Sequence, residues 1–129
     1  PYTTLFRSAR LGAQHVQRWA SYADHRPEKA AAASPATQAP ARGVTPPARP
    51  RPTWLLPEPL RLAEHDGRPL HGGPLQLHGG PERIEAGWFD GAPVCRDYHV
   101  ASGADHRLRW VFRELRGTQS GWFLHGLFG

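Results

Sequence analysis

Acidic, histidine and cysteine side chains are the groups from which this chain would have to build a catalytic or metal site. Asp90 and Asp97 lie seven residues apart across a Gly/Pro turn, whereas phosphoryl transfer on two metal ions needs carboxylates that a rigid scaffold holds together. The eight histidines and the single cysteine are scattered, without a CxxC or HxxxH spacing. Cys95, Asp97 and His99 alternate along one expected strand, so they project in parallel and do not converge as a nucleophile set. We therefore expect no enzymatic site, no metal and no cofactor.

Arginine and aromatic side chains are arranged for recognition instead. In one strand-like segment they interleave: Arg107, Arg109, Trp110, Phe112 and Arg113. Such a pattern is typical of a stacking platform for single-stranded nucleic acid, and it also fits a solvated face over an aromatic core. Residues 81–129 contain six arginines and six acidic residues, so this part of the chain lacks the positive excess that phosphate binding needs. We therefore expect any contact with DNA to be weak and to come from Arg42, Arg49 and Arg51.

A second aromatic group lies in a segment flanked by glycines, where rings can stay partly exposed. Trp88 and Phe89 are followed by Arg96 and Tyr98 on the next expected strand. Exposed aromatics with arginine nearby are the usual chemistry of protein-binding hot spots. These four residues predict a docking site for a protein partner, with plain core packing as the alternative.

The elements that position these residues are short. Fourteen glycines and fourteen prolines indicate turns and linkers rather than long helices. Alternating patterns predict strands over Cys95–Val100 and Leu108–Arg113, and Trp122–Phe128 is apolar on both faces, which is typical of a central strand. Trp54–Pro59 contains two prolines and is expected to form an extended edge. The spacing of these segments predicts a mainly β fold for residues 54–129, a small antiparallel meander or partial barrel.

The first 53 residues have a different character. The 3/4 spacing of Val16, Trp19, Ala20 and Ala23 predicts one short helix within residues 9–23. Alanine and proline dominate residues 31–53, which predicts a disordered linker because such a stretch buries too little surface to offset its ordering entropy.

Three features of the sequence bear on the origin and the location of this chain. Pro1–Ser8 read as the translation of a sequencing adapter, so we expect an artefact there and a chain that is the C-terminal part of a longer protein. A single cysteine excludes an internal disulfide and favours a reducing compartment. No apolar run approaches the roughly 18 residues of a membrane span. We expect a cytoplasmic protein.

Several motifs occur in a fixed order after Ser8. They are Ala9–Gly12, Asp24–Glu28, Arg51–Pro52, Trp54–Pro59, Gly80–Glu85, Gly87–Gly91, Arg96–Tyr98, Trp110–Arg113 and Gly121–Phe128. Together they resemble the C-terminal region of the ImuB family, homologues of the Y-family DNA polymerases that are associated with inducible mutagenesis.

The resemblance implies how the chain is organised and what it does. Residues 9–30 would close a polymerase-like region, and residues 54–129 would form a C-terminal β module. The family bridges a RecA-like companion protein, an error-prone C-family DNA polymerase and the sliding clamp, the last through a region upstream of this chain. No polymerase catalytic residue can be carried over, because the palm and fingers positions are missing. The resemblance therefore predicts a non-catalytic interaction module of translesion synthesis in the bacterial cytoplasm, near the nucleoid; the alternative is a β module that binds single-stranded nucleic acid.

Overall fold

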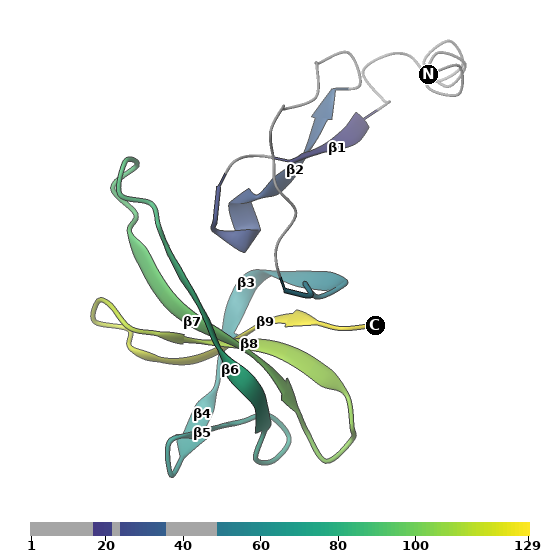
Figure 1. Ribbon diagram of the computed structural model, residues 1–129, viewed down its shortest axis with the longest axis vertical. Helices are drawn as coiled ribbons and strands as arrows, with labels where there is room; N and C mark the ends of the chain where they lie inside the picture. Colours follow the sequence, from purple (N-terminus) through teal and green to yellow (C-terminus); the bar gives the residue numbers. More distant parts are fainter. Residues whose placement is uncertain (1–16, 22–23, 36–48) are drawn as a thin grey trace. The chain divides into compact units, whose positions relative to one another are not determined.

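The computed structural model describes residues 17–21, 24–35 and 49–129 of two compact units, 1–46 and 47–129 (Figure 1). Antiparallel strands build both units. Among the described residues, the helical structure is limited to a one-turn 3-10 helix, Pro27–Lys29. The predicted fold class, mainly β and antiparallel, is confirmed.

The described part of the first unit is a two-stranded hairpin, in which β1 (Gln17–Ser21) pairs with β2 (Ala31–Pro35). The predicted helix is therefore wrong for residues 17–21, and the predicted linker is wrong for residues 31–35. A short helix is stable only when its apolar stripe is buried, and Trp19 is exposed. Pairing between the two segments satisfies their backbone groups instead. The predictions for residues 1–16 and for the linker over 36–48, including Arg42, lie outside the described residues.

The second unit is organised around a five-stranded sheet with the order β3-β9-β8-β7-β6. Its strands are β3 (Trp54–Arg61), β6 (Gln76–Ala86), β7 (Val94–Ser102), β8 (Leu108–Glu114) and β9 (Gly121–Leu127). The last four follow one another as an antiparallel meander, which Figure 1 shows as strongly twisted ribbons. β3 returns to pair with β9 at the far side, and β3 and β6 remain the edges of an open sheet.

Both faces of this sheet are buried, so it has two cores. The aromatic face contains Ile84, Tyr98, Trp110 and Phe112, with Val100, Phe123 and Phe128 packed against them. The aliphatic face contains Leu62, Leu75, Ala101, Val111, Trp122 and Leu124, with Leu56 and Leu77 packed against them. The alternation over Leu108–Arg113 predicts a half-buried strand, whereas residues 109–112 are all buried in β8.

A small hairpin contributes to the aliphatic face. It consists of β4 (Ala63–His65) and β5 (Arg68–Leu70), joined by Asp66 and Gly67, both with positive φ, as a two-residue hairpin turn requires. The leucines that flank the hairpin, Leu62 and Leu75, are buried in the aliphatic core. The Leu62 amide donates to the Trp122 carbonyl at 2.9 Å and so fixes the start of the hairpin against β9.

Proline and glycine explain the irregularities at the two edges. β3 is an edge strand, as predicted, and its pairing with β9 is interrupted between Leu55 and Leu60, where Pro57 and Pro59 have no amide to donate. β6 has a register shift between His78 and Glu82, across a Gly-Gly-Pro sequence. β9 is flanked by β3 and β8 and is therefore central, as its apolar sequence predicts.

Candidate interaction surface

Two loops at one end of the sheet form a surface that includes two exposed aromatic side chains. Residues 87–93 join β6 to β7, and residues 115–120 join β8 to β9, so both loops lie at the same end of the meander. Phe89 is fully exposed, and Trp88 is 53% exposed. The guanidinium of Arg116 lies 4.4 Å from the centre of the Trp88 ring and connects the two loops. Leu115 beside it is also exposed. We call Trp88, Phe89, Leu115 and Arg116 the hairpin tip.

Local sequence holds the tip in this form. Gly87 and Gly91 flank residues 88–90 of the first loop, and both have positive φ, a conformation that residues with a side chain rarely adopt. Between them, the Asp90 carboxylate accepts a hydrogen bond from the Ala92 amide at 3.1 Å, an Asx turn. In the second loop, the Leu115 amide donates to the Cys95 carbonyl at 2.9 Å. Turn geometry and backbone hydrogen bonds thus define both loops, and the Trp88 and Phe89 rings between the two glycines are exposed.

The four residues predicted to dock a partner do not lie together. Trp88 and Phe89 form the tip, but Tyr98 is 1% exposed, and its hydroxyl lies 2.8 Å from Nδ1 of the buried His125. Arg96 lies over the Phe112 ring on the aromatic face, with a mostly buried side chain that pairs with Glu114 at 3.2 Å. Tyr98 is therefore a core residue rather than a surface residue. The sequence alternation in this strand does not show that Tyr98 is buried, because it does not reveal whether one or both faces of the sheet are covered.

The residues predicted to bind nucleic acid are separated by the sheet. The register places Trp110 on the aromatic face, where it is 2% exposed, and places Arg109 and Arg113 on the opposite face. Arg107 and Arg113 are exposed, but Arg109 is buried. The arginines and the aromatic rings of this segment therefore do not form one continuous stacking platform.

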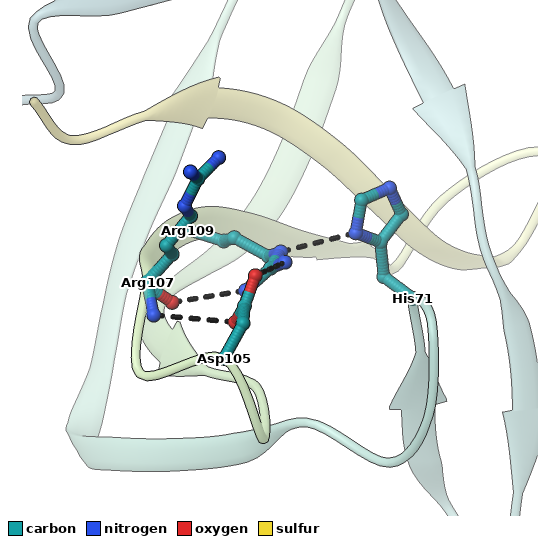
Figure 2. Close-up of polar contacts among 4 residues, drawn as sticks. All are labelled: His71, Asp105, Arg107 and Arg109. Atoms are coloured by element: carbon teal, nitrogen blue, oxygen red, sulfur yellow. Dashed lines mark hydrogen bonds and ion pairs between the residues drawn. The ribbon is translucent and has the colours of Figure 1, made fainter.

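Arg109 organises a polar cluster that Figure 2 shows in detail. Its guanidinium donates two hydrogen bonds to the Asp105 carboxylate, at 2.9 and 2.8 Å, and its Nε donates to Nδ1 of His71 at 3.0 Å. A further bond reaches the Arg107 carbonyl at 2.9 Å, while the Arg107 side chain points away from the cluster (Figure 2). The Arg109 hydrogen bonds hold the pKa of Asp105 well below its usual range. The cluster fastens the β7–β8 loop to the segment that precedes β6.

The groups considered for catalysis are engaged in pairs or buried. Asp97 accepts two hydrogen bonds from Arg83, at 2.7 and 2.8 Å, which lower its pKa. Burial raises the pKa of the Cys95 thiol, which donates to Glu85 at 3.2 Å, so the thiolate required of a nucleophile is disfavoured. Within the described ranges, no group of three or more histidine, cysteine or acidic residues is placed to hold a metal ion. The same ranges contain no helix that is long and apolar enough to cross a membrane.

Two arginine–aromatic contacts are not predicted by any pattern in the sequence. Arg116 directly follows the end of β8, and its stacking on Trp88 depends on the meander bringing two loops together. Arg51 lies in the predicted linker, yet its guanidinium is 4.9 Å from the centre of the Trp110 ring, and it pairs with Glu82. These contacts join residues that are 28, 31 and 59 positions apart, separations over which local sequence patterns carry no signal.

Comparisons with protein-family models, with curated proteins and with solved structures found no match.

Proposed function

We propose that the second unit is a non-catalytic protein-interaction module of a translesion-synthesis factor that resembles the ImuB family. In this proposal it helps to bridge the RecA-like companion protein and the error-prone C-family polymerase, in the bacterial cytoplasm near the nucleoid. The sliding clamp would be bound by a region upstream of this chain.

The observation that carries the proposal is the hairpin tip. A phenylalanine that is fully exposed gains nothing from folding and has a large apolar area to bury in a complex. Trp88 is held beside it by the stacked Arg116, so the anchor is partly pre-organised. Tryptophan and arginine are also the side chains most enriched among binding hot spots.

The alternative, binding of single-stranded nucleic acid, has less support. Base stacking requires accessible rings, and Trp110 and Phe112 are both 2% exposed. Arg109 is engaged with Asp105 and His71, which removes one cation from the proposed set. Arg107 and Arg113 are the exposed arginines that remain of the predicted set, and two cations are too few for strong binding to phosphates.

The test is a titration of the full chain against the RecA-like companion and the C-family polymerase, with a single-stranded oligonucleotide in parallel. The variant Trp88→Ala/Phe89→Ala should lower affinity for a protein partner about tenfold or more, as expected for hot-spot side chains. Trp54→Ala is the matched control, because Trp54 is 67% exposed on β3 but lies outside the tip. It should leave the affinity within about threefold.

Unchanged affinity in a normally folded tip variant would remove the tip from the interface. Binding of the oligonucleotide without binding of either protein would support the alternative function instead.

A further inference from the structure

The residues that precede β3 cross the aromatic face of the sheet. Arg49 donates to the Gly80 carbonyl at 2.8 Å, and Arg51 donates two hydrogen bonds to the Glu82 carboxylate, at 3.0 and 2.6 Å. Gly80 and Glu82 belong to β6, the edge strand farthest from β3 in the sheet order. We call residues 49–53 the strap, since they connect the β3 side of the open sheet to its other edge.

The aromatic face has three features that fit the strap. The Trp110 ring lies under the Arg51 guanidinium, 4.9 Å from ring centre to carbon, and Glu82 binds that guanidinium through both oxygens. Gly126 provides a notch for Pro52: a Cβ at Gly126 would lie 2.5 Å from Cγ of that proline. An aromatic ring, a carboxylate and a side-chain-free notch thus line up along the strap.

The sequence of the strap explains why it lies across the face rather than pairing as a strand. Residues 49–52 read Arg-Pro-Arg-Pro. Each proline fixes its own φ near −65° and pushes the preceding arginine towards an extended or polyproline II conformation. The prolines also lack the amide that a β ladder needs. Side chains therefore carry the recognition, as they do when proline-rich peptides dock on aromatic grooves.

We propose that the aromatic face is a binding site for extended Arg-Pro peptides, which the chain fills with its own strap. The partner is a segment of another protein in which arginine alternates with proline. Arg51 and Glu82 remain partly exposed, so their pair can exchange without unfolding the sheet. The site uses Glu82, Trp110 and Gly126, none of which belongs to the hairpin tip, so the proposal is independent of the proposed function.

The strap acts as an internal competitor. Because it is joined directly to β3, its effective concentration is in the mM range or above, and an outside peptide must exceed it to bind. The wild-type chain should therefore bind a free Arg-Pro peptide weakly, and a chain with a disabled strap should bind it more tightly.

The experiment uses the full chain carrying Arg49→Ala/Arg51→Ala and a labelled peptide with the sequence of residues 48–53, Ala-Arg-Pro-Arg-Pro-Thr. Fluorescence anisotropy should give at least tenfold tighter binding to this variant than to the wild type. Adding Glu82→Gln to the variant should remove the gain, as should replacing both arginines of the peptide by alanine. Arg113→Ala removes an exposed arginine from the opposite face and should bind the peptide as the wild type does.

A folded strap variant that binds the peptide no better than the wild type overturns the proposal. Retention of the gain with Glu82→Gln also overturns it.

A measurement on the wild-type chain covers the case in which the strap variant does not fold. Millimolar peptide should shift the indole resonance of Trp110 and the amide of Glu82 in a saturable way, and leave Trp88 and Phe89 unmoved. Absence of a shift at Trp110, or shifts confined to the tip, would contradict the proposed site.

Discussion

At the scale of single residues, three arginines cover aromatic rings of the second unit. Arg51, Arg61 and Arg96 lie over Trp110, Phe123 and Phe112, within 4.9, 5.6 and 4.7 Å of the ring centres. A planar guanidinium can stack flat on a ring and bind a carboxylate through two parallel hydrogen bonds, whereas the compact ammonium of lysine lacks this planar fork. The excess of arginine over lysine in the sequence is therefore used structurally. It does not by itself indicate a nucleic-acid surface.

Replacing Arg109 by lysine tests this role. Arg109→Lys keeps the charge but loses the forked geometry and the hydrogen bond to His71, so we expect the free energy of unfolding to fall by about 1 kcal/mol. Arg107→Lys is the matched control, since the Arg107 side chain is exposed and points away from the cluster; it should stay within about 0.5 kcal/mol of the wild type. Urea unfolding of both variants measures the difference. Equal stabilities would show that the forked contacts contribute nothing.

We expect His99 to make the stability of the second unit depend on pH. Burial lowers the pKa of His99 below its ordinary value of 6.5; Asp97 and the Gly79 carbonyl oppose this, and Arg49 reinforces it. As pH falls through 6.5 towards the lowered pKa of the folded state, the unfolded chain binds the His99 proton more readily than the folded chain does. The free energy of unfolding therefore decreases as pH falls through this range. We expect His99→Gln to lose less stability than the wild type between pH 7.5 and 5.5, measured by urea unfolding. Equal losses would contradict this assignment.

At the scale of elements, the sequence predicts what depends on local pattern and misses what depends on pairing. The strands over Cys95–Val100, Leu108–Arg113 and Trp122–Phe128 are correct because period-two alternation or an unbroken apolar run is a local signal. The five residues of β1 follow a helical spacing yet form a strand, because a partner segment ten residues later decides their conformation.

The strap and the hairpin tip show the same limit for the candidate site. Composition predicts a linker across residues 49–53, and it is indeed rich in proline. Whether such a segment docks depends on Glu82, Trp110 and Gly126, which no local pattern connects to it. The exposure of Trp88 and Phe89 at the tip can be predicted from the glycines that flank them. The contact of Arg116 with Trp88 cannot, because it depends on the fold bringing the two loops together.

Gly126 tests how tightly the strap is packed on β9. In Gly126→Ala the new methyl group would lie 2.5 Å from Cγ of Pro52 and 2.9 Å from the Trp54 carbonyl oxygen. Overpacking of this kind costs about 1–3 kcal/mol, and backbone cannot move aside as a flexible side chain can. Gly80→Ala is the control, because nothing lies within 4 Å of a Cβ there. Thermal unfolding should show a lower midpoint for Gly126→Ala alone; the same midpoint in both variants would mean that the strap yields freely.

At the scale of the whole molecule, the chain divides before the strap and not after it. The sequence places the start of the β module at Trp54, where the first apolar anchor follows the proline-rich stretch. The compact unit begins at Pro47 instead. The described residues between these positions, 49–53, form the strap, and they belong to the fold although their composition is that of a linker. This boundary decides which fragment can be studied as an independent module.

Three chains test the boundary: the full sequence, residues 47–129 and residues 54–129. Both hydrophobic cores lie within residues 47–129, so this fragment should unfold cooperatively at the same denaturant midpoint as the second unit of the full chain. The fragment 54–129 lacks the partly exposed Arg51–Glu82 pair and the stacking of Arg51 on Trp110, which together contribute about 1–2 kcal/mol, and its midpoint should fall accordingly. Adding the peptide of residues 48–53 in trans should then raise the midpoint of 54–129 but not of 47–129, since only the shorter fragment has an open site. Identical midpoints for the two fragments would mean that the strap rests on the aromatic face without stabilising it, and the unit would then begin at β3.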